Sequence, residues 1–427
     1  MRKLILLICY FSVVFLAPAQ LTSTTGKLYT NYPGIDYLIV FNGITSSSDI
    51  TYTGSGSTIN WYKFSNSTIS ISNQAYISPE DATGYILNVD GNITKIWVID
   101  YSKYITLTDY SIEPENNPSA QCENVNLIIK APTIYYQKPT DSQQYSIARN
   151  FNVQYETKKW DGKIWKDTTT TINLNPISPS VPTPYRNTSF TILGDQFTSN
   201  LGITSLSVSS SPYTTNAVIC RMTSNVVVRD STNEAERPKA PTQLAGSAPL
   251  DIQFLSNANE PVATYYNWSF YKNNANVPFI SRTDKDQRYT FTEAGTYKVK
   301  VTASNSICSF SDSMTVSVST SEIRVPNVFT PNGDGINDEF RVAYKSIVSF
   351  QCWIYNRWGR LLYTWADPQK GWDGKINGKD AVPGPYFYVI KARGSDYDPK
   401  STPNSKTNLR IGEWLLKGDI NLLRGVQ

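Results

Sequence analysis

The side chains that could do chemistry in this 427-residue sequence are limited by a complete absence of histidine. Without histidine, neither a Ser-His-Asp nor a Cys-His arrangement can form, and a His-ligated zinc or copper site is excluded. Paired carboxylates, which glycosidases use, need no histidine. No cluster of Asp and Glu stands out between residues 20 and 236. The sequence therefore predicts a non-enzymatic protein, with a carboxylate-dependent polysaccharide hydrolase as the enzymatic alternative.

Oxygen-bearing side chains crowd around two glycines near the C-terminus. The residues are Asn332, Asp334, Asn337 and Asp338. Carboxylate and amide oxygens around glycines are what calcium loops use, but the spacing is not that of an EF-hand and no Glu closes the loop. The pattern favours an Asx-rich turn and leaves a calcium site as the alternative. No other cofactor is expected.

Five cysteines are present, and the first, Cys9, lies in an apolar N-terminal run. The remaining four are Cys122, Cys220, Cys308 and Cys352. None forms a CxxC pair, so a zinc site has no support. In an oxidising compartment we expect a Cys122–Cys220 disulfide within one domain, and buried free thiols remain the alternative, above all for Cys308 and Cys352.

The N-terminus has the organisation of a secretory signal peptide. Arg2 and Lys3 precede an apolar run from Leu4 to Leu16, and Ala17-Pro18-Ala19 supplies small residues at the cleavage spacing. Residues 1–19 are therefore expected to be removed. No later apolar stretch approaches the roughly 20 residues that span a bilayer. The formal charge is +4, of which Arg2 and Lys3 supply two, and the scattered Lys and Arg predict no nucleic-acid partner.

The composition predicts an all-β protein, because Tyr, Thr, Ser, Val and Ile are abundant while Ala and Leu are scarce. Short apolar runs such as Tyr37–Phe41 are separated by Gly, Asn, Asp and Ser clusters, which favours tandem immunoglobulin-like β-sandwich domains after the signal peptide. Asp161-Gly162 predicts a hairpin turn. The expected domains are residues 20–105, 106–236, 240–320 and 322–427, with a proline-containing linker at 237–241.

The third expected domain carries a recognisable pattern. Gly295-Thr296-Tyr297 opens an alternating strand that runs to Asn305, and Trp268 lies in an earlier strand. This segment resembles a PKD domain, which implies a seven-stranded immunoglobulin-like sandwich that acts as a rigid spacer with Trp268 in its core. Val299, Val301 and Ala303 share one face of their strand and are expected to be buried.

Sequence motifs are densest from Val325 to Arg424. We single out Pro331, Asn332, Gly333, Asp334, Gly335, Asn337, Asp338, Asn356, Arg357, Trp358, Gly359, Trp372, Asp373, Gly374, Gly384, Tyr386, Gly418 and Arg424. This segment resembles the gliding-motility-associated C-terminal domain, the type B sorting domain of the type IX secretion system. Pro385 and the polar loop from Gly394 to Asn408 depart from the family pattern.

The sequence also predicts the environment of three tryptophans and one arginine of this segment. Trp353, Trp358 and Trp372 are expected in the core of a compact β-domain. For Arg357 we expect packing on an aromatic ring or a local ion pair, with direct contact to the secretion machinery as the alternative.

The resemblance implies export through the periplasm and an outer-membrane translocon, then retention at the cell surface or release. It also implies partner proteins in the outer membrane. The many Tyr and Trp residues on short strands suggest that residues 20–236 present a face that binds an extracellular glycan or protein. A structural component of a surface assembly is the alternative.

Overall fold

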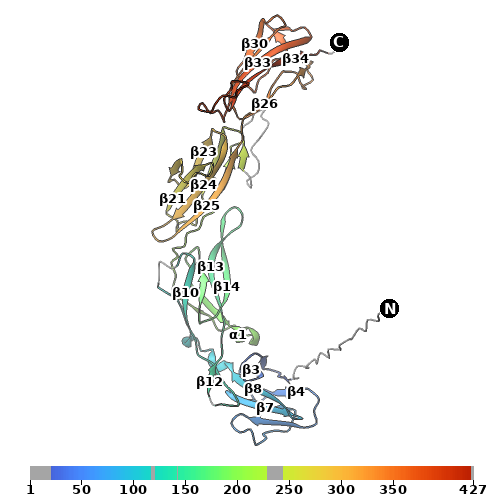
Figure 1. Ribbon diagram of the computed structural model, residues 1–427. Helices are drawn as coiled ribbons and strands as arrows, with labels where there is room; N and C mark the ends of the chain where they lie inside the picture. Colours follow the sequence, from blue (N-terminus) through green and yellow to red (C-terminus); the bar gives the residue numbers. More distant parts are fainter. Residues whose placement is uncertain (1–20, 117–120, 142, 228–243, 425–427) are drawn as a thin grey trace, which may run out of the picture. The chain divides into compact units, whose positions relative to one another are not determined.

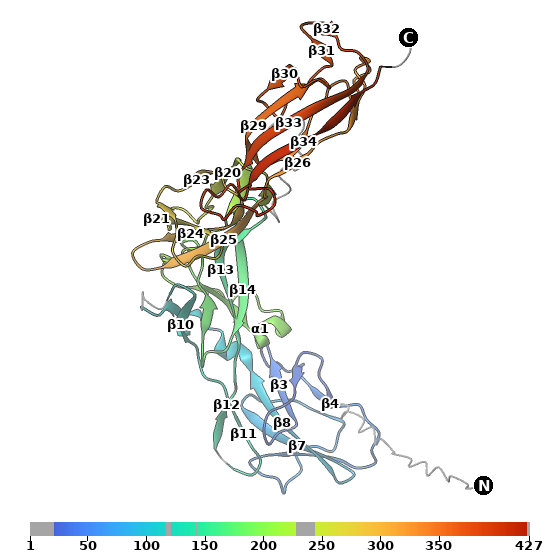
Figure 2. The ribbon, with the colours of Figure 1, turned by 45° about the horizontal axis from the view of Figure 1, so that its top comes forward.

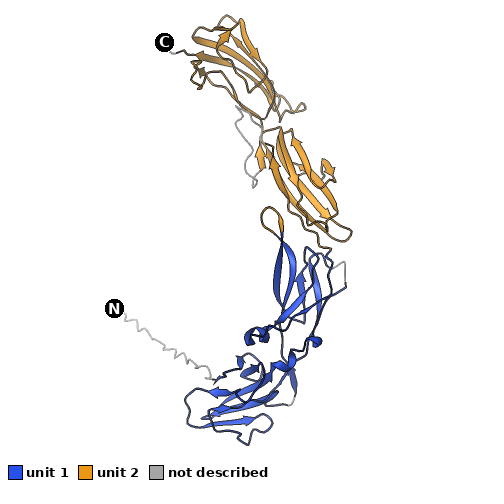
Figure 3. Cartoon of the chain, turned by 180° about the vertical axis from the view of Figure 1, so that it is seen from behind, with its two compact units in different colours: residues 1–159, 166–215 blue, residues 160–165, 216–427 orange. Residues whose placement is uncertain are grey.

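The computed structural model describes residues 21–116, 121–141, 143–227 and 244–424 (Figure 1). The expected signal peptide and the linker at 237–241 lie outside these ranges. The described chain is almost entirely β and forms tandem sandwiches, as predicted. It divides into two compact units, one of residues 1–159 with 166–215 and one of residues 160–165 with 216–427 (Figure 3). No helix in the described ranges has the length and apolar character needed to cross a membrane.

The first unit begins with a sandwich of eight strands. They are β1 (Leu21–Thr22), β2 (Lys27–Tyr29), β3 (Tyr37–Phe41), β4 (Ile50–Tyr52), β5 (Ile59–Lys63), β6 (Tyr76–Ile77), β7 (Thr83–Val89) and β8 (Asn92–Asp100). Strands β1-β4-β6 form one sheet, and β2-β3-β8-β7-β5 form the other. Ile39 and Phe41 of β3 and Val98 of β8 point into the core between these two sheets.

The larger sheet is buried on both of its faces. Leu38 and Val40 of β3 and Trp97 and Ile99 of β8 point away from the first core, yet all four are buried. They join a second apolar cluster with Ile134, Tyr136, Ile147 and Phe197, which come from the following sandwich. This explains why β3 reads as a continuous apolar run rather than an alternating one. The expected separate domain of residues 20–105 therefore shares a core with the residues that follow it.

The second sandwich follows two short 3₁₀ helices, η1 (Tyr101–Tyr104) and η2 (Leu107–Asp109). Its elements are β9 (Ser111–Pro114), β10 (Asn124–Lys130), β11 (Tyr135–Gln137), β12 (Gln144–Ser146), β13 (Phe151–Trp160), β14 (Trp165–Leu174), β15 (Ser180–Pro182), β16 (Thr191–Asp195), α1 (Gln196–Leu201) and β17 (Val208–Ser209). The sheets are β15-β10-β9, β11-β12 and β14-β13-β16-β17. Strands β13 and β14 flank the predicted turn at Asp161-Gly162, where Gly162 has a φ of 104°.

A buried ion pair of the second sandwich is bonded to the segment that follows β8. Arg149 Nε donates to Asp195 Oδ2 at 2.6 Å, and both side chains are almost completely buried. The Arg149 guanidinium also donates to the Tyr101 hydroxyl (3.0 Å), the Tyr110 hydroxyl (2.7 Å) and the Pro132 carbonyl (2.8 Å). Asp195 caps α1 by accepting from the N–H of Phe197 and of Thr198. Each charge thus has the partners that a group removed from water requires.

The second unit contains a third sandwich. Its strands are β18 (Thr223–Val226), β19 (Leu244–Gly246), β20 (Leu250–Leu255), β21 (Tyr265–Lys272), β22 (Ile280–Arg282), β23 (Gln287–Phe291), β24 (Gly295–Ser304) and β25 (Ser309–Val318). The two sheets are β18-β20-β23 and β19-β25-β24-β21-β22. Trp268, Val299, Val301 and Ala303 are fully buried between them, as predicted.

The expected boundary at residue 236 is too late in the chain. Strand β18 pairs antiparallel with β20, with Thr223 opposite Leu255 and Val226 opposite Ile252. The segment from Asn216 onward accordingly belongs to the second unit.

The C-terminal domain completes the second unit. Its strands are β26 (Glu322–Arg324), β27 (Val328–Phe329), β28 (Ala343–Lys345), β29 (Ile347–Tyr355), β30 (Leu361–Trp365), β31 (Lys375–Ile376), β32 (Lys379–Asp380), β33 (Gly384–Gly394) and β34 (Glu413–Leu422). A five-stranded sheet, β27-β34-β33-β29-β30, carries most of the core (Figure 2).

The predicted Cys122–Cys220 disulfide is wrong. Cys220 is a free, buried thiol of the second unit, where its backbone bridges to Ala258 and its Sγ contacts the Phe310 carbonyl at 3.8 Å. Burial raises its pKa to about 11, so the unreactive thiol form dominates near neutral pH. Cys352 is also free and buried, whereas Cys122 and Cys308 are disulfide-bonded.

The Arg149–Asp195 pair gives the first testable expectation. In the Arg149→Met variant, Asp195 stays buried without its cation, so the free energy of unfolding should fall by about 3–5 kcal/mol. Urea unfolding of the mature protein measures this loss. As a control, Lys63→Met breaks the exposed Lys63–Glu80 pair (2.7 Å) and should cost less than about 1 kcal/mol. Equal small losses in both variants would contradict the stabilising role of the buried network.

Candidate functional site

Most of the motif residues of the C-terminal domain gather at one end of its five-stranded sheet. The register places Phe329 of β27 and Gly384 of β33 both opposite Leu422 of β34. It also places Tyr355, the last residue of β29, opposite Phe387 of β33. The loops that carry the motifs, at 330–338, 356–360, 373–374 and 381–384, therefore meet at this end.

The loop from Thr330 to Asp338 is organised around one carboxylate. Asp338 accepts hydrogen bonds from the backbone N–H of Gly333 (2.6 Å), Gly335 (2.8 Å) and Asn332 (3.0 Å). These N–H groups, that of Gly333 first, lower the pKa of Asp338 because they stabilise the charged form. Gly333 and Gly335 have φ values of 82° and 81°, a region that favours glycine. The sequence motif thus encodes a tightly bonded turn.

The carboxylates of this loop are hydrogen-bonded to donors of the loop itself. Asp334 Oδ1 accepts from the N–H of Ile336 at 2.7 Å, and its Oδ2 accepts from the Asn332 side chain at 2.9 Å. Both oxygens of Asp338 also accept from N–H groups. These hydrogen bonds are those of an Asx-rich turn.

Arg424 ties the neighbouring loops together from the end of β34. Its guanidinium donates to the Pro331 carbonyl (3.3 Å) and the Gly374 carbonyl (3.1 Å), and it forms an ion pair with Asp380 at 3.2 Å. Gly374 has a φ of 72°, and a Cβ there would lie 3.0 Å from the Pro331 ring. The Arg424 side chain therefore holds two loops that lie far from it in the sequence.

Trp372 anchors the same region from inside the core, as predicted. It is fully buried, its Nε1 donates to the Lys375 carbonyl at 2.8 Å, and its ring contacts those of Phe329 and Tyr386. Next to it, Asp373 Oδ1 accepts from the Lys375 N–H at 3.0 Å, which closes the turn before β31.

The remaining motif positions of the sheet serve its packing. Tyr386 is buried and donates through its hydroxyl to the Val382 carbonyl at 2.7 Å. Gly418 lies opposite Tyr388, and a Cβ there would come within 2.6 Å of the Tyr388 hydroxyl. Gly384 opens β33 with a φ of 139°. Pro385 next to it is exposed, so this departure from the family pattern disturbs no core contact.

The hairpin between β29 and β30 corrects one expectation. Asn356 Oδ1 accepts from the N–H of Trp358 (3.0 Å) and of Arg360 (2.9 Å), and Gly359 has a φ of 76°. Trp358 is therefore at the tip of a turn and is 75% exposed rather than buried. Trp353 is half-buried. The Arg357 guanidinium lies 4.2 Å from the centre of the Trp358 ring, which is the aromatic packing expected for it.

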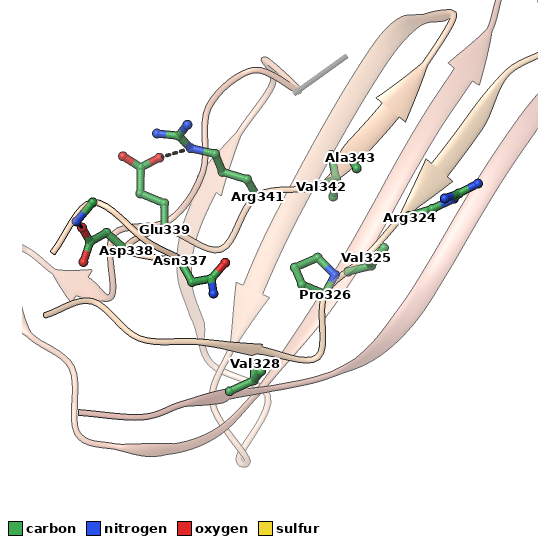
Figure 4. A pocket seen from close by; sticks show the side chains of 11 residues that line it. Arg324, Val325, Pro326, Val328, Asn337, Asp338, Glu339, Arg341, Val342 and Ala343 are labelled. Carbon is green, nitrogen blue, oxygen red and sulfur yellow. Dashed lines mark hydrogen bonds and ion pairs between the residues drawn. The ribbon is translucent and has the colours of Figure 1, made fainter. Parts of the chain in front are cut away.

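A groove of about 680 Å³ opens beside the loop at 330–338. Strands β26 and β28 are paired up to Arg324 and Ala343, and beyond these residues the two segments diverge. One wall of the groove comes from residues 324–328 and the other from residues 335–343, which include Gly335, Asn337 and Asp338 of the motif (Figure 4). The exposed end of the domain thus combines a structured motif with a vacant groove.

The first unit contains a second groove, of about 520 Å³, in its second sandwich. Polar side chains line it, among them Gln154, Glu156, Thr169 and Asn187. Glu156 Oε2 lies 3.3 Å from Arg186 Nη1. The groove offers uncharged donors and acceptors together with one carboxylate.

Sequence reasoning did not find either groove. Both depend on how separate segments are placed in space, and this placement leaves no local sequence pattern. The motif residues at 331–338 were recognised, but nothing in their spacing indicates that they border a groove.

Two family models match parts of this chain. Residues 323–404 match the CHU_C Type IX secretion signal domain, and residues 114–210 match a fibronectin type III domain. The first match confirms the sorting-domain resemblance and covers most of the C-terminal domain. The second match covers much of the second sandwich. No curated protein matches the sequence.

Solved structures with similarity to the chain are multidomain proteins. They include three N-terminal domains of the outer capsid protein Hoc of bacteriophage RB49 (13% identity, 73% of this chain and 98% of that one, TM-score 0.21). They also include Sidekick-1 immunoglobulin domains 1–5 (11%, 94% and 77%, 0.23) and dimeric latent PorU from Porphyromonas gingivalis (10%, 78% and 35%, 0.16). At these scores the similarities carry no argument about function.

The calcium alternative can be tested directly. If the 330–338 loop is an Asx-rich turn and not a calcium site, addition of Ca²⁺ should neither release saturable heat nor raise the melting temperature of the mature protein. Isothermal titration calorimetry and a thermal melt with and without Ca²⁺ measure both. Saturable binding that Asp338→Asn abolishes, while Asp419→Asn on the exposed face of β34 leaves it intact, would establish a calcium site instead.

Proposed function

We propose that this protein is exported by the type IX secretion system and acts outside the cell by binding a glycan or protein through its first unit. The export half rests on the secretion-signal match at residues 323–404, which implies interaction with that machinery and a secreted or cell-surface location. The binding of a glycan or protein is the more specific part of the proposal. We also propose that the protein is retained at the outer surface and has partner proteins in the outer membrane.

The observation that carries the binding proposal is the polar groove of the second sandwich. Gln154 Nε2 donates to the Thr171 hydroxyl at 3.4 Å. The Asn187 carbonyl oxygen accepts from the Thr215 N–H at 3.1 Å. Hydroxyls of Thr169 and Thr214 border the same space. Amides and hydroxyls that both donate and accept suit the hydroxyl groups of a sugar.

The rigid construction of the first unit supports the same proposal. Its two sandwiches share an apolar cluster and the Arg149–Asp195 network, so the groove is held by a fixed framework. A preorganised site loses less conformational entropy when a ligand binds. The third sandwich would serve as the PKD-like spacer of the chain, and its fully buried Trp268 and compact core agree with that role.

The export half predicts the fate of a truncated protein. A chain that stops before Ile323 lacks the segment matched by the secretion-signal model and should accumulate in the periplasm of the producing bacterium. Fractionation and surface proteolysis measure where it is. Full display of the truncated protein at the surface would refute the sorting role of the C-terminal domain.

The binding half predicts a saturable extracellular ligand. The mature protein should bind members of a glycan or matrix-protein array, and Gln154→Leu should weaken that binding about tenfold, because it removes a hydrogen-bonding amide from the groove. The matched control is Gln144→Leu, which changes an exposed glutamine of β12 outside the groove. An array without any ligand, or equal affinities of both variants, would contradict this assignment.

A further inference from the structure

We propose that the groove of the C-terminal domain binds an extended polypeptide segment by β-strand addition. The segment would belong to a protein of the export or surface-attachment machinery, so the inference rests on the export half of the proposed function. It goes beyond that half because it assigns the site of contact and the mode of recognition. Figure 4 shows the two walls of the groove facing each other.

One wall presents free backbone groups at Val328. Strand β27 is an edge strand that pairs only with β34. The carbonyls of Asn327 and Phe329 accept from Asn421 (3.0 Å) and Leu423 (3.1 Å), so these two residues direct their backbone toward β34. Because successive residues of a strand direct their N–H and C=O groups to opposite sides, those of Val328 point away from β34. Val328 lines the groove and is 40% exposed.

The opposite wall presents free backbone groups at Glu339 and Arg341. Phe340 exchanges two backbone hydrogen bonds with Trp372, at 2.9 and 3.1 Å. The same alternation turns the N–H and C=O groups of its two neighbours in the other direction. Glu339 and Arg341 line the groove, whereas Phe340 is fully buried in the core. Two backbone edges without partners among the described residues therefore border the same space.

The dimensions of the groove fit a short strand. Residues 324–328, which form one wall, would span about 17 Å if fully extended. An extended peptide of about five residues matches this length and could pair with the backbone of Val328, while Pro326, which has no N–H, and Arg324, which is paired with Ala343, add no donor. Unpaired strand edges are templates for such pairing, and main-chain hydrogen bonds then supply much of the affinity.

The charges of the groove favour a polypeptide over a highly charged ligand. Its lining holds two cations, Arg324 and Arg341, and two anions, Asp338 and Glu339. Arg341 is paired with Glu339 at 2.7 Å, Arg324 with Glu322 at 2.6 Å, and Asp338 is held by backbone N–H groups. A net charge of zero offers no attraction to a polyanion and is complementary to an uncharged backbone. All of these lining residues lie within the segment matched by the secretion-signal model.

A pair of variants at Arg341 separates main-chain from side-chain recognition. Arg341→Ala removes the side chain and its ion pair but keeps the backbone N–H. Arg341→Pro also removes the N–H that faces the groove, while the Phe340–Trp372 hydrogen bonds remain. We expect the Ala variant to reach the cell surface normally and the Pro variant to be reduced about tenfold there, at equal melting temperatures of the purified proteins. Normal display of the Pro variant would overturn the proposal.

A cross-linking measurement keeps the proposal testable even if Arg341→Pro disturbs folding. The photoreactive residue p-benzoylphenylalanine is incorporated in place of Val328 and, as a control, in place of Val348, which is 56% exposed and lies outside the groove. In living cells, position 328 should give an adduct that maps to one short segment of an outer-membrane protein, and position 348 should not. Adducts of equal yield at both positions, no adduct at 328, or an adduct with a second copy of this chain would each refute it.

The outcomes also distinguish a failure of the export role from a failure of the groove assignment. If a chain truncated before Ile323 is still displayed, the export role itself fails. If the truncated chain is trapped while Arg341→Pro is displayed normally, only the groove assignment fails.

Discussion

The pairing of Arg149 with Asp195 is the interaction on which the first unit depends. Both side chains are removed from water, a step that costs several kcal/mol per charge unless partners replace the lost hydration. Three residues from different parts of the unit, Tyr101, Tyr110 and Pro132, supply those partners. Burial raises the pKa of Tyr101, so its hydroxyl stays protonated and donates to Asp195 at 3.0 Å. The network therefore ties the segment that follows β8 to the second sandwich.

In the C-terminal domain, side chains supply hydrogen-bond partners to backbone groups rather than to buried charges. Arg424 satisfies the carbonyls of Pro331 and Gly374, and Asp338 satisfies three N–H groups of its own loop. Among the described residues, the outward backbone groups of Val328, Glu339 and Arg341 lack such partners, and they border a groove. The contrast between a closely bonded frame and an open edge is what makes this groove a binding candidate.

The two units of this exported protein carry different features. The second unit carries the secretion-signal segment at the C-terminal end of the described chain, and the first unit offers a polar groove on a rigid framework.

The sequence by itself determined the features that arise from local patterns. The turn at Asp161-Gly162, the buried face of Val299, Val301 and Ala303, and the bonded loop around Asp338 all follow from alternation and turn chemistry over a few residues. The sorting motifs were likewise readable, because each is a short run of turn residues and aromatics.

Only the tertiary structure decided features that depend on distant neighbours. Cys220 is free because its segment folds with the third sandwich, although its sequence position suggested the second. Trp358 is exposed because Asn356 closes a turn beneath it, although its size suggested the core. The segments that pack together in space determine which residues are buried, which cysteines pair and which strand edges stay open. A short stretch of sequence does not specify which segments these are.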